Sequence, residues 1–417
     1  MDAVVSLIIL SLIILFGVIG EFFFRKTGIP DAIWLIVIGI LFNYLFNFNA
    51  SIAIQEIIPI FVILTLVVIL FDGGLNLRLG SLVKNSGSAF LISILYFIFS
   101  IILVTGITYI LSIFGVLTDW NIWFGIILGA ILGGTSSAIV LPLVKLAKLD
   151  EKLQGILSVE SAFNDALCIV VVFTILDYLG SAGESSLGLI FKNIAASFAI
   201  GIVLGIIVGL VWLYLLKKLS SEEDITEYFY VLTLSLLILL YVVTESLGGS
   251  AVISIFVFGL IMGSTELLNK LFKTEFYVIN QDILLINKQI AFLIKSFFFV
   301  LIGVMFVFVL NPFLIAIVIV TMLILARYFS IIIPGTTRHL IPEERRLLYF
   351  FAPKGLAAGL LAISLINYSN ILPGASLISN IVFGVIMIFI IIATIVLFIY
   401  KHKARYKDES TNQEPLK

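Results

Sequence analysis

Long apolar runs constrain this chain more than any other feature of its sequence. A helix needs about 20 mostly apolar residues to cross the roughly 30 Å hydrocarbon layer of a membrane. Such runs, separated by short polar breaks, predict thirteen spans at about 3–23, 29–47, 53–74, 86–115, 120–145, 155–179, 188–216, 228–244, 248–264, 290–310, 312–333, 345–367 and 376–400. We therefore expect an all-α polytopic membrane protein.

Composition excludes several other classes of protein. The chain is 62% hydrophobic and 12% charged, whereas a soluble domain carries about 25% charged residues. Its net charge of -1 argues against a nucleic-acid partner. A single cysteine, Cys168, excludes a cysteine-cluster metal site, and the two histidines, His339 and His402, lie outside the predicted spans. We expect membrane lipid as a partner, and neither a nucleic acid nor a cofactor.

The basic residues predict how the chain is oriented. Lys and Arg concentrate in the cytoplasmic loops of membrane proteins. Here they occupy one alternate set of predicted loops, including 25–26, 78–84, 145–152, 217–218, 270–288, 338–346 and the segment from 401, while the opposite set holds none. This pattern predicts a multi-pass protein of the cell membrane with its N-terminus outside and its C-terminus in the cytoplasm. It divides the chain into a transmembrane domain, 1–401, and a short cytoplasmic tail, 402–417.

Five ionisable residues lie well inside the predicted spans, where a charge costs roughly 2.5–3.5 kcal/mol; they are Asp72, Glu160, Asp165, Arg327 and Lys354. Snorkelling or a structural ion pair can account for Asp72 and Lys354. Neither explanation fits Glu160 and Asp165 well, because both carboxylates lie in one helix. Helical spacing places Glu160 on the same face as Asn164, with Asp165 about 140° around the axis from Glu160. Arg327 is the expected counter-ion for one of the two carboxylates.

Two spans contain residues that interrupt a helix. The fifth span carries Gly-Gly-Thr-Ser-Ser at 133–137, and the twelfth carries Ala-Pro-Lys-Gly-Leu-Ala-Ala-Gly at 352–359. These spans run in opposite directions and are seven spans apart. Discontinuous helices at matching positions of two halves indicate a transporter built from inverted repeats, with its binding site at the breaks.

Several short motifs in the chain, together with the features above, resemble those of a known family. It consists of Phe-Asp-Gly-Gly-Leu at 71–75, Gly-Thr-Ser-Ser at 134–137, Glu-Ser-Ala-Phe-Asn-Asp at 160–165, Arg327, and Pro-Lys-Gly-Leu-Ala-Ala-Gly at 353–359. In order, spacing and number of spans the chain resembles the monovalent cation/proton antiporter superfamily, in its electroneutral sodium/proton branch. The resemblance covers nearly the whole chain, and the element at 160–165 is its most specific part.

The resemblance implies a fold, an activity and a site. The fold has crossed discontinuous helices 5 and 12, and works as a homodimer in which a core subdomain moves against a dimerisation subdomain. The activity is exchange of Na+ or Li+ for H+, which serves pH homeostasis. Asp165 would bind the transported Na+ or a proton in turn, with Asn164, Ser161, Thr135 and Asp72 completing the site. Glu160 and Arg327 would form a structural ion pair, and Ser136, Ser137, Pro353, Lys354 and Gly355 would shape the breaks and compensate the helix dipoles.

Several departures leave the choice of cation open. Many sodium/proton relatives have Thr-Asp-Pro where this chain has Thr-Ser-Ser at 135–137, and the continuation resembles the potassium/proton side of the superfamily. Asp72 stands where Glu is common, and Lys354 stands where Arg is frequent. K+/H+ exchange is therefore an alternative.

Other classes of function have less support. An intramembrane hydrolase is a remote alternative, because none of the usual hydrolase motifs is present. A channel would show a conductance far above exchanger turnover, and a sensor would normally need a cytoplasmic output domain. A carrier of organic anions would need an unpaired cation at the broken helices, where Lys354 is the only candidate. We thus expect a secondary transporter and not an enzyme.

Overall fold

The computed structural model describes residues 3–27, 29–46, 52–76, 79–136, 139–140, 143–144, 151–180, 187–220, 228–333, 337 and 342–411. Every regular element in these ranges is a helix, so the predicted all-α class is confirmed. The first half contains α1 (Ala3–Thr27), α2 (Asp31–Phe46), α3 (Ile52–Asn76), α4 (Leu79–Ile113), α5 (Ile122–Leu132) and α7 (Glu151–Gly180).

The second half continues with α8 (Leu187–Leu219), α10 (Phe229–Ser246), α11 (Ala251–Gly263), α12 (Thr265–Phe272), α13 (Gln281–Met305) and α14 (Leu310–Ile332). It ends with α15 (Pro342–Phe350), α16 (Leu356–Ser364), the 3-10 helix η2 (Leu365–Tyr368) and α17 (Ala375–Thr411). Helix α17 therefore runs past residue 401, where the sequence placed the boundary between the domain and the tail.

Seven of the described helices are long and apolar enough to cross a membrane. An eighth span results if α11 and α12, which are bent by 72° relative to each other, are taken together. Shorter apolar helices occupy Ser11–Phe24, Asp31–Leu45, Ile60–Asn76 and Ile122–Leu132. The count of thirteen spans stays a prediction.

Helix α13 begins earlier than the predicted tenth span, 290–310. Asn280 caps it, because its side-chain oxygen accepts a hydrogen bond from the backbone N–H of Ile283 at 3.1 Å. Residues 281–289 thus form the first part of α13. The sequence predicted that they belong to the cytoplasmic loop between the ninth and tenth spans, 265–289. Asn287 consequently lies in a helix and not in a loop.

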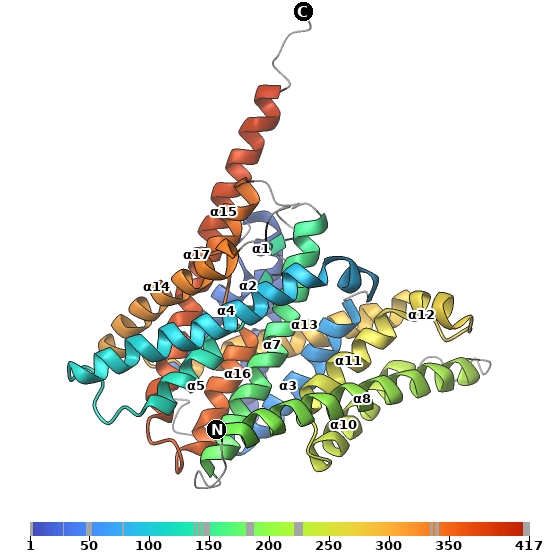
Figure 1. The fold of residues 1–417 in the computed structure, drawn as a ribbon, viewed down its shortest axis with the longest axis horizontal. Coiled ribbons are helices and arrows are strands. Elements are labelled where there is room, and N and C mark those ends of the chain that lie inside the picture. The colour runs from blue at the N-terminus through green and yellow to red at the C-terminus, as the bar shows by residue number, and fades with distance from the viewer. Residues whose placement is uncertain are drawn as a thin grey trace, which may run out of the picture.

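The helices pack around α7. Helix α4 packs against α5, α7 and α14, while α11 lies against α3 and α8, and α2 lies against α13. In the most apolar stretch of α7, 71% of the residues are buried, whereas 17% are buried in the corresponding stretch of α8. Helix α7 is therefore central and α8 is peripheral. Figure 1 shows α7 in the middle of the bundle, with α5 and α16 beside it.

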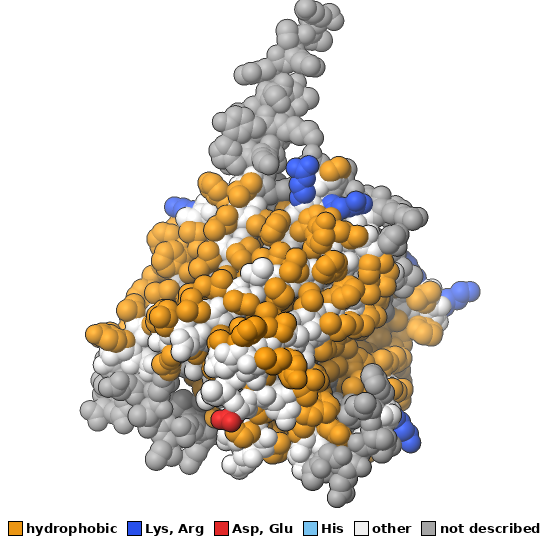
Figure 2. Space-filling view, turned by 60° about the vertical axis from the view of Figure 1, so that its left-hand side comes forward, with side chains coloured by type: hydrophobic (Ala, Val, Ile, Leu, Met, Phe, Trp, Pro, Cys, Tyr) orange, Lys and Arg blue, Asp and Glu red, His pale blue; other side chains and the backbone are white. Residues whose placement is uncertain are grey.

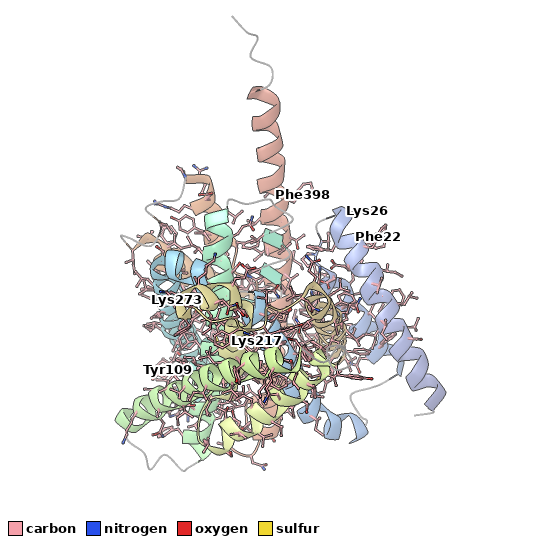
Figure 3. All side chains as sticks on the ribbon, turned by 90° about the vertical axis from the view of Figure 1, so that its right-hand side faces the viewer. Phe22, Lys26, Tyr109, Lys217, Lys273 and Phe398 are labelled. Carbon is pink, nitrogen blue, oxygen red and sulfur yellow. The ribbon has the colours of Figure 1, made fainter. Side chains whose placement is uncertain are left out.

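The surface has the pattern of a protein in a membrane. Many large apolar side chains are exposed, including Leu15, Phe114 and Tyr214. Figure 2 shows hydrophobic side chains across the broad middle of one face, with the visible Lys and Arg side chains around its edges. In Figure 3, Lys26 at the end of α1 lies toward the same end of the molecule as the projecting part of α17.

Candidate functional site

The interruptions predicted in the fifth and twelfth spans meet in the structure. Helix α5 ends at Leu132 and its chain continues without helix through residue 136, while residues 351–355 separate α15 from α16. The backbone N–H of Ser136 donates a hydrogen bond to the carbonyl of Pro353 at 2.8 Å. The hydroxyl of Ser136 accepts a hydrogen bond from the N–H of Leu356 at 3.4 Å. Two segments more than 200 residues apart thus satisfy each other's freed backbone groups.

Glycines allow these segments to approach so closely. A Cβ at Gly355 would lie 2.8 Å from the Cβ of Ser136, and one at Gly134 would lie 2.9 Å from the Sγ of Cys168 on α7. Both distances are too short for a side chain, so these positions require glycine. Ser137, which was assigned to the same break, lies outside the described residues.

Three of the predicted site residues lie on α7, in the part of the helix that packs against this junction. Asn164 and Ser161 are buried, and Asp165 is 8% exposed. A Cβ at Gly134 would lie 3.7 Å from the carbonyl oxygen of Asn164, which places the break in the fifth span against this turn of α7. The hydroxyl of Ser161 donates to the carbonyl of Ser158 at 3.2 Å.

Two side chains at this junction are buried without a hydrogen-bond partner. Both amide atoms of Asn164 and the hydroxyl oxygen of Thr135 have no partner among the described residues, although Asn164 is 0% exposed and Thr135 is 3% exposed. A buried polar atom without a partner costs about 1–3 kcal/mol. A buried polar group of this kind needs a physical explanation, such as local strain, an ordered water or a bound ion.

Glu160 and Arg327 form a buried ion pair behind the site. Arg327 donates to both carboxylate oxygens of Glu160, one of them at 2.9 Å, and its Nε donates to the carbonyl of Leu348 at 2.9 Å. Each side chain is 1% exposed. A bidentate pair with a further backbone acceptor has the geometry that a buried guanidinium needs.

Lys354 lies fully buried at the break between α15 and α16. Its ammonium group donates to the Gly134 carbonyl and to the hydroxyl of Tyr96 on α4, the latter at 2.7 Å. Because Gly134 directly follows the C-terminal end of α5, the positive charge lies at the negative end of that helix. Arg327 approaches the ring of Tyr96 as well, with its Cζ 5.2 Å from the centroid. The Tyr96 ring is therefore close to the side chains of both Arg327 and Lys354.

Asp72 on α3 forms hydrogen bonds with two asparagine side chains. Its Oδ1 accepts hydrogen bonds from the side-chain amides of Asn76 at 3.0 Å and of Asn287 on α13 at 2.6 Å. Its side chain is partly exposed. The structure thus joins Asp72 to Asn287 on α13, which the sequence did not group with it.

Sequence reasoning missed several polar residues inside the bundle. Tyr96 is one uncharged residue in an apolar run, and Asn287 was read as part of a loop. Lys295 and Asp31 also form an ion pair at 3.1 Å, with 14% and 7% side-chain exposure. Their only signal was a charge a few residues inside a predicted span, where solvation at the span end is the usual explanation.

Apolar helices around a junction of two interrupted helices, with a buried carboxylate beside it, define the class of secondary transporters. The chain matches the family described as "Sodium/hydrogen exchanger, transmembrane" over residues 10–402. It therefore belongs to the sodium/hydrogen exchanger family. Membership confirms the class that the sequence predicted, a transporter and not an enzyme.

Individual relatives are more distant. The chain is similar to the K(+)/H(+) antiporter NhaP2 of Shewanella sp. (strain MR-4), at 29% identity over 57% of this chain and 40% of the relative. It is 27% identical to the Na(+)/H(+) antiporter ApNhaP of Aphanothece halophytica, over 88% of this chain and 67% of the relative. The alignment thus spans less than half the length of the first of these relatives.

A solved structure shares the fold. The sodium proton antiporter MjNhaP1 from Methanocaldococcus jannaschii, determined at pH 8, superposes with a TM-score of 0.74 at 20% identity. The superposition covers 97% of this chain and 98% of the other. The arrangement of helices is therefore shared from end to end.

Proposed function

We propose that the chain exchanges Na+ or Li+ for H+ across the cell membrane, with Asp165 binding the cation and the proton in turn. The observation that carries this proposal is the burial of the Asn164 amide and the Thr135 hydroxyl without a hydrogen-bond partner among the described residues, at the junction of two interrupted helices. Asp165 directly follows Asn164 on α7. Hard monovalent cations bind oxygen atoms, and carbonyls freed by helix breaks supply more of them. Ser161 adds a hydroxyl on the same helix.

A single titratable carboxylate is enough for exchange. Because a cation and a proton compete for the same oxygens of Asp165, binding one releases the other. Alternating exposure of the site to the two sides then couples their movement in opposite directions. We propose that a core containing the crossed helices 5 and 12 moves against a dimerisation subdomain in a homodimer, with lipid around it. In this arrangement the N-terminus lies outside, the C-terminus lies in the cytoplasm, and the physiological role is pH homeostasis.

Exchange of K+ for H+ is a second candidate, and two observations favour it. Relatives at 29% identity are described as K(+)/H(+) antiporters, and Ser136 stands where many sodium/proton relatives have Asp. A cation panel on one reconstituted sample separates the candidates. We expect Na+ and Li+ to dissipate an imposed pH gradient, with K+ requiring at least about tenfold higher concentration, which corresponds to roughly 1.4 kcal/mol. Equal or better use of K+ would replace sodium by potassium in the proposal.

The neutral Asn164 predicts electroneutral exchange of one cation for one proton. Only Asp165 changes its ligand at the site, so each half-cycle moves the same net charge. We expect Na+-driven exchange in proteoliposomes to keep its rate when a membrane potential is imposed. On a solid-supported membrane, the sustained current should stay at the level of the Asp165→Asn variant. A current that grows with the potential would contradict the one-to-one stoichiometry.

A further inference from the structure

The side chain of Tyr96 on α4 contacts two buried basic residues through two different groups. Its hydroxyl oxygen accepts a hydrogen bond from the Lys354 ammonium at 2.7 Å, and this ammonium lies 4.5 Å from the ring centroid. The guanidinium Cζ of Arg327 lies 5.2 Å from the same centroid. All three side chains are buried. The hydroxyl is therefore the closer contact of Lys354, and the ring is the contact of Arg327.

Helix α4 holds Tyr96 in a tightly packed place beside the junction of the interrupted helices. Near its side chain, the hydroxyl of the buried Ser93 lies 3.5 Å from the carbonyl oxygen of Glu160 on α7. A Cβ built on Gly133 would lie 2.6 Å from a ring carbon of Phe97, so the end of α5 packs directly on α4. The residues around Tyr96 thus fix where its hydroxyl lies.

The ammonium of Lys354 donates to two uncharged oxygens, the hydroxyl of Tyr96 and the carbonyl of Gly134. A buried charge needs such hydrogen bonds, because they replace those that water would make. The carbonyl attracts the ammonium to the C-terminal end of α5. The hydroxyl holds it there from a second helix, so its loss would leave the ammonium less restrained.

Two carboxylates on α7, those of Glu160 and Asp165, are close enough for their charges to act on Lys354. Both carboxylate oxygens of Glu160 accept hydrogen bonds from Arg327, so Glu160 already has a basic partner. Asp165 is the carboxylate that we propose for cation binding. An ammonium group carries the same single charge as Na+, so a less restrained Lys354 would compete with Na+ for Asp165.

We propose that Tyr96 is a positioning residue for cation binding, whose hydroxyl holds the Lys354 ammonium at the end of α5 and so limits its competition with the transported cation for Asp165. This inference rests on the proposed function, because it takes Asp165 to be the cation ligand. It assigns the hydroxyl an effect on the KM for the cation. The ring, through Arg327, contributes to stability.

The test measures the KM for Na+ and the maximal exchange rate of purified, reconstituted Tyr96→Phe. This variant keeps the ring beside Arg327 and removes one acceptor of Lys354. We expect the KM to rise about tenfold, as for loss of a hydrogen bond to a charged group, with a maximal rate within about twofold of wild type, because excess Na+ displaces a competitor. Tyr109→Phe, at an exposed position on the same helix, is the matched control and should leave the KM unchanged.

A second variant at the same position separates the hydroxyl from the ring. Tyr96→Leu removes both, so its KM should equal that of Tyr96→Phe, whereas its Tm in detergent should fall further because the contact with Arg327 is lost as well. An unchanged KM in Tyr96→Phe would overturn the inference. A KM that rises only in Tyr96→Leu, together with the fall in Tm, would also overturn it, because packing of the ring would then be responsible.

A double-mutant cycle tests whether Tyr96 acts through Lys354. Lys354→Met removes the competing ammonium, so adding Tyr96→Phe should change the KM by less than about twofold. Lys354→Gln, which is uncharged but polar, serves as a second background. Where either background exchanges too slowly for a KM, the Na+ concentration that gives half of the maximal rise in Tm provides the same comparison. A tenfold effect that persists without the ammonium would contradict the inference.

Failure of the inference and failure of the proposed function give different results. An inactive Asp165→Asn variant together with an unchanged KM in Tyr96→Phe removes only the role of Tyr96. Full exchange in Asp165→Asn removes the proposed function itself. The KM does not depend on how much active protein enters the vesicles, so a lower yield of a variant does not affect the comparison.

Discussion

Asp165→Asn is expected to abolish Na+-dependent dissipation of a pH gradient in proteoliposomes, down to the rate of protein-free vesicles. The amide keeps the size and shape of the side chain, but it can neither release a proton at working pH nor offer a negative charge to a cation. Both half-cycles of exchange therefore lose their ligand. No other variant considered for this chain should have a larger effect on activity.

The matched control is Asp119→Asn, in the turn between α4 and α5. Asp119 is exposed and has a positive φ of 55°, a conformation in which Asn is well tolerated. This variant should fold normally and exchange at the rate of the wild type. Residual cation-dependent exchange in Asp165→Asn, at the same protein density, would show that another group carries the proton.

Glu160→Ala is expected to cause the largest loss of stability. Among the described residues, the Leu348 carbonyl and the ring of Tyr96 would then be the remaining partners of the buried Arg327 guanidinium. Removing one member of a buried ion pair costs about 3–5 kcal/mol. The measurement is the free energy of unfolding of the detergent-purified protein, followed by thermal or denaturant unfolding.

An exposed ion pair in the same chain provides the control. Lys217 and Glu275 are 3.2 Å apart, with 46% and 90% side-chain exposure, so Glu275→Ala should cost about 1 kcal/mol or less. The double variant Glu160→Leu, Arg327→Met should recover much of the lost stability, because apolar residues of similar volume remove both charges from the interior. If Glu160→Ala unfolds like Glu275→Ala, the pair does not stabilise the fold.

Charged residues made much of the site predictable from the sequence. A carboxylate or guanidinium inside an apolar run stands out because its burial is costly, and Glu160, Asp165 and Arg327 were identified in this way. The helix breaks were visible because clustered glycines, serines and a proline disrupt an apolar helix. Glu160 and Arg327 are 167 positions apart, so the residues alone left open whether Glu160 or Asp165 is the partner of Arg327. The family resemblance implied Glu160, and the structure has the ion pair between Glu160 and Arg327.

Neutral polar residues were not predictable in the same way. In the sequence Tyr96 resembles any aromatic residue in a span, and only the structure shows Arg327 and Lys354 close to its ring. Asn287 precedes the apolar part of α13, and only the helix that begins at Gln281 brings it to Asp72. For both residues the informative quantity is a distance between helices, which the order of residues along the chain does not contain.

The unbroken length of α17 has a mechanical consequence. The helix passes Lys354 at Phe389, whose ring centroid lies 5.4 Å from the ammonium group, and it continues to Thr411. At 1.5 Å per residue, about 33 Å of rigid rod separate these two points. A 10° tilt of this rod about Phe389 would displace Thr411 by about 6 Å, so a small change of angle beside Lys354 would become a large displacement at the far end of the helix.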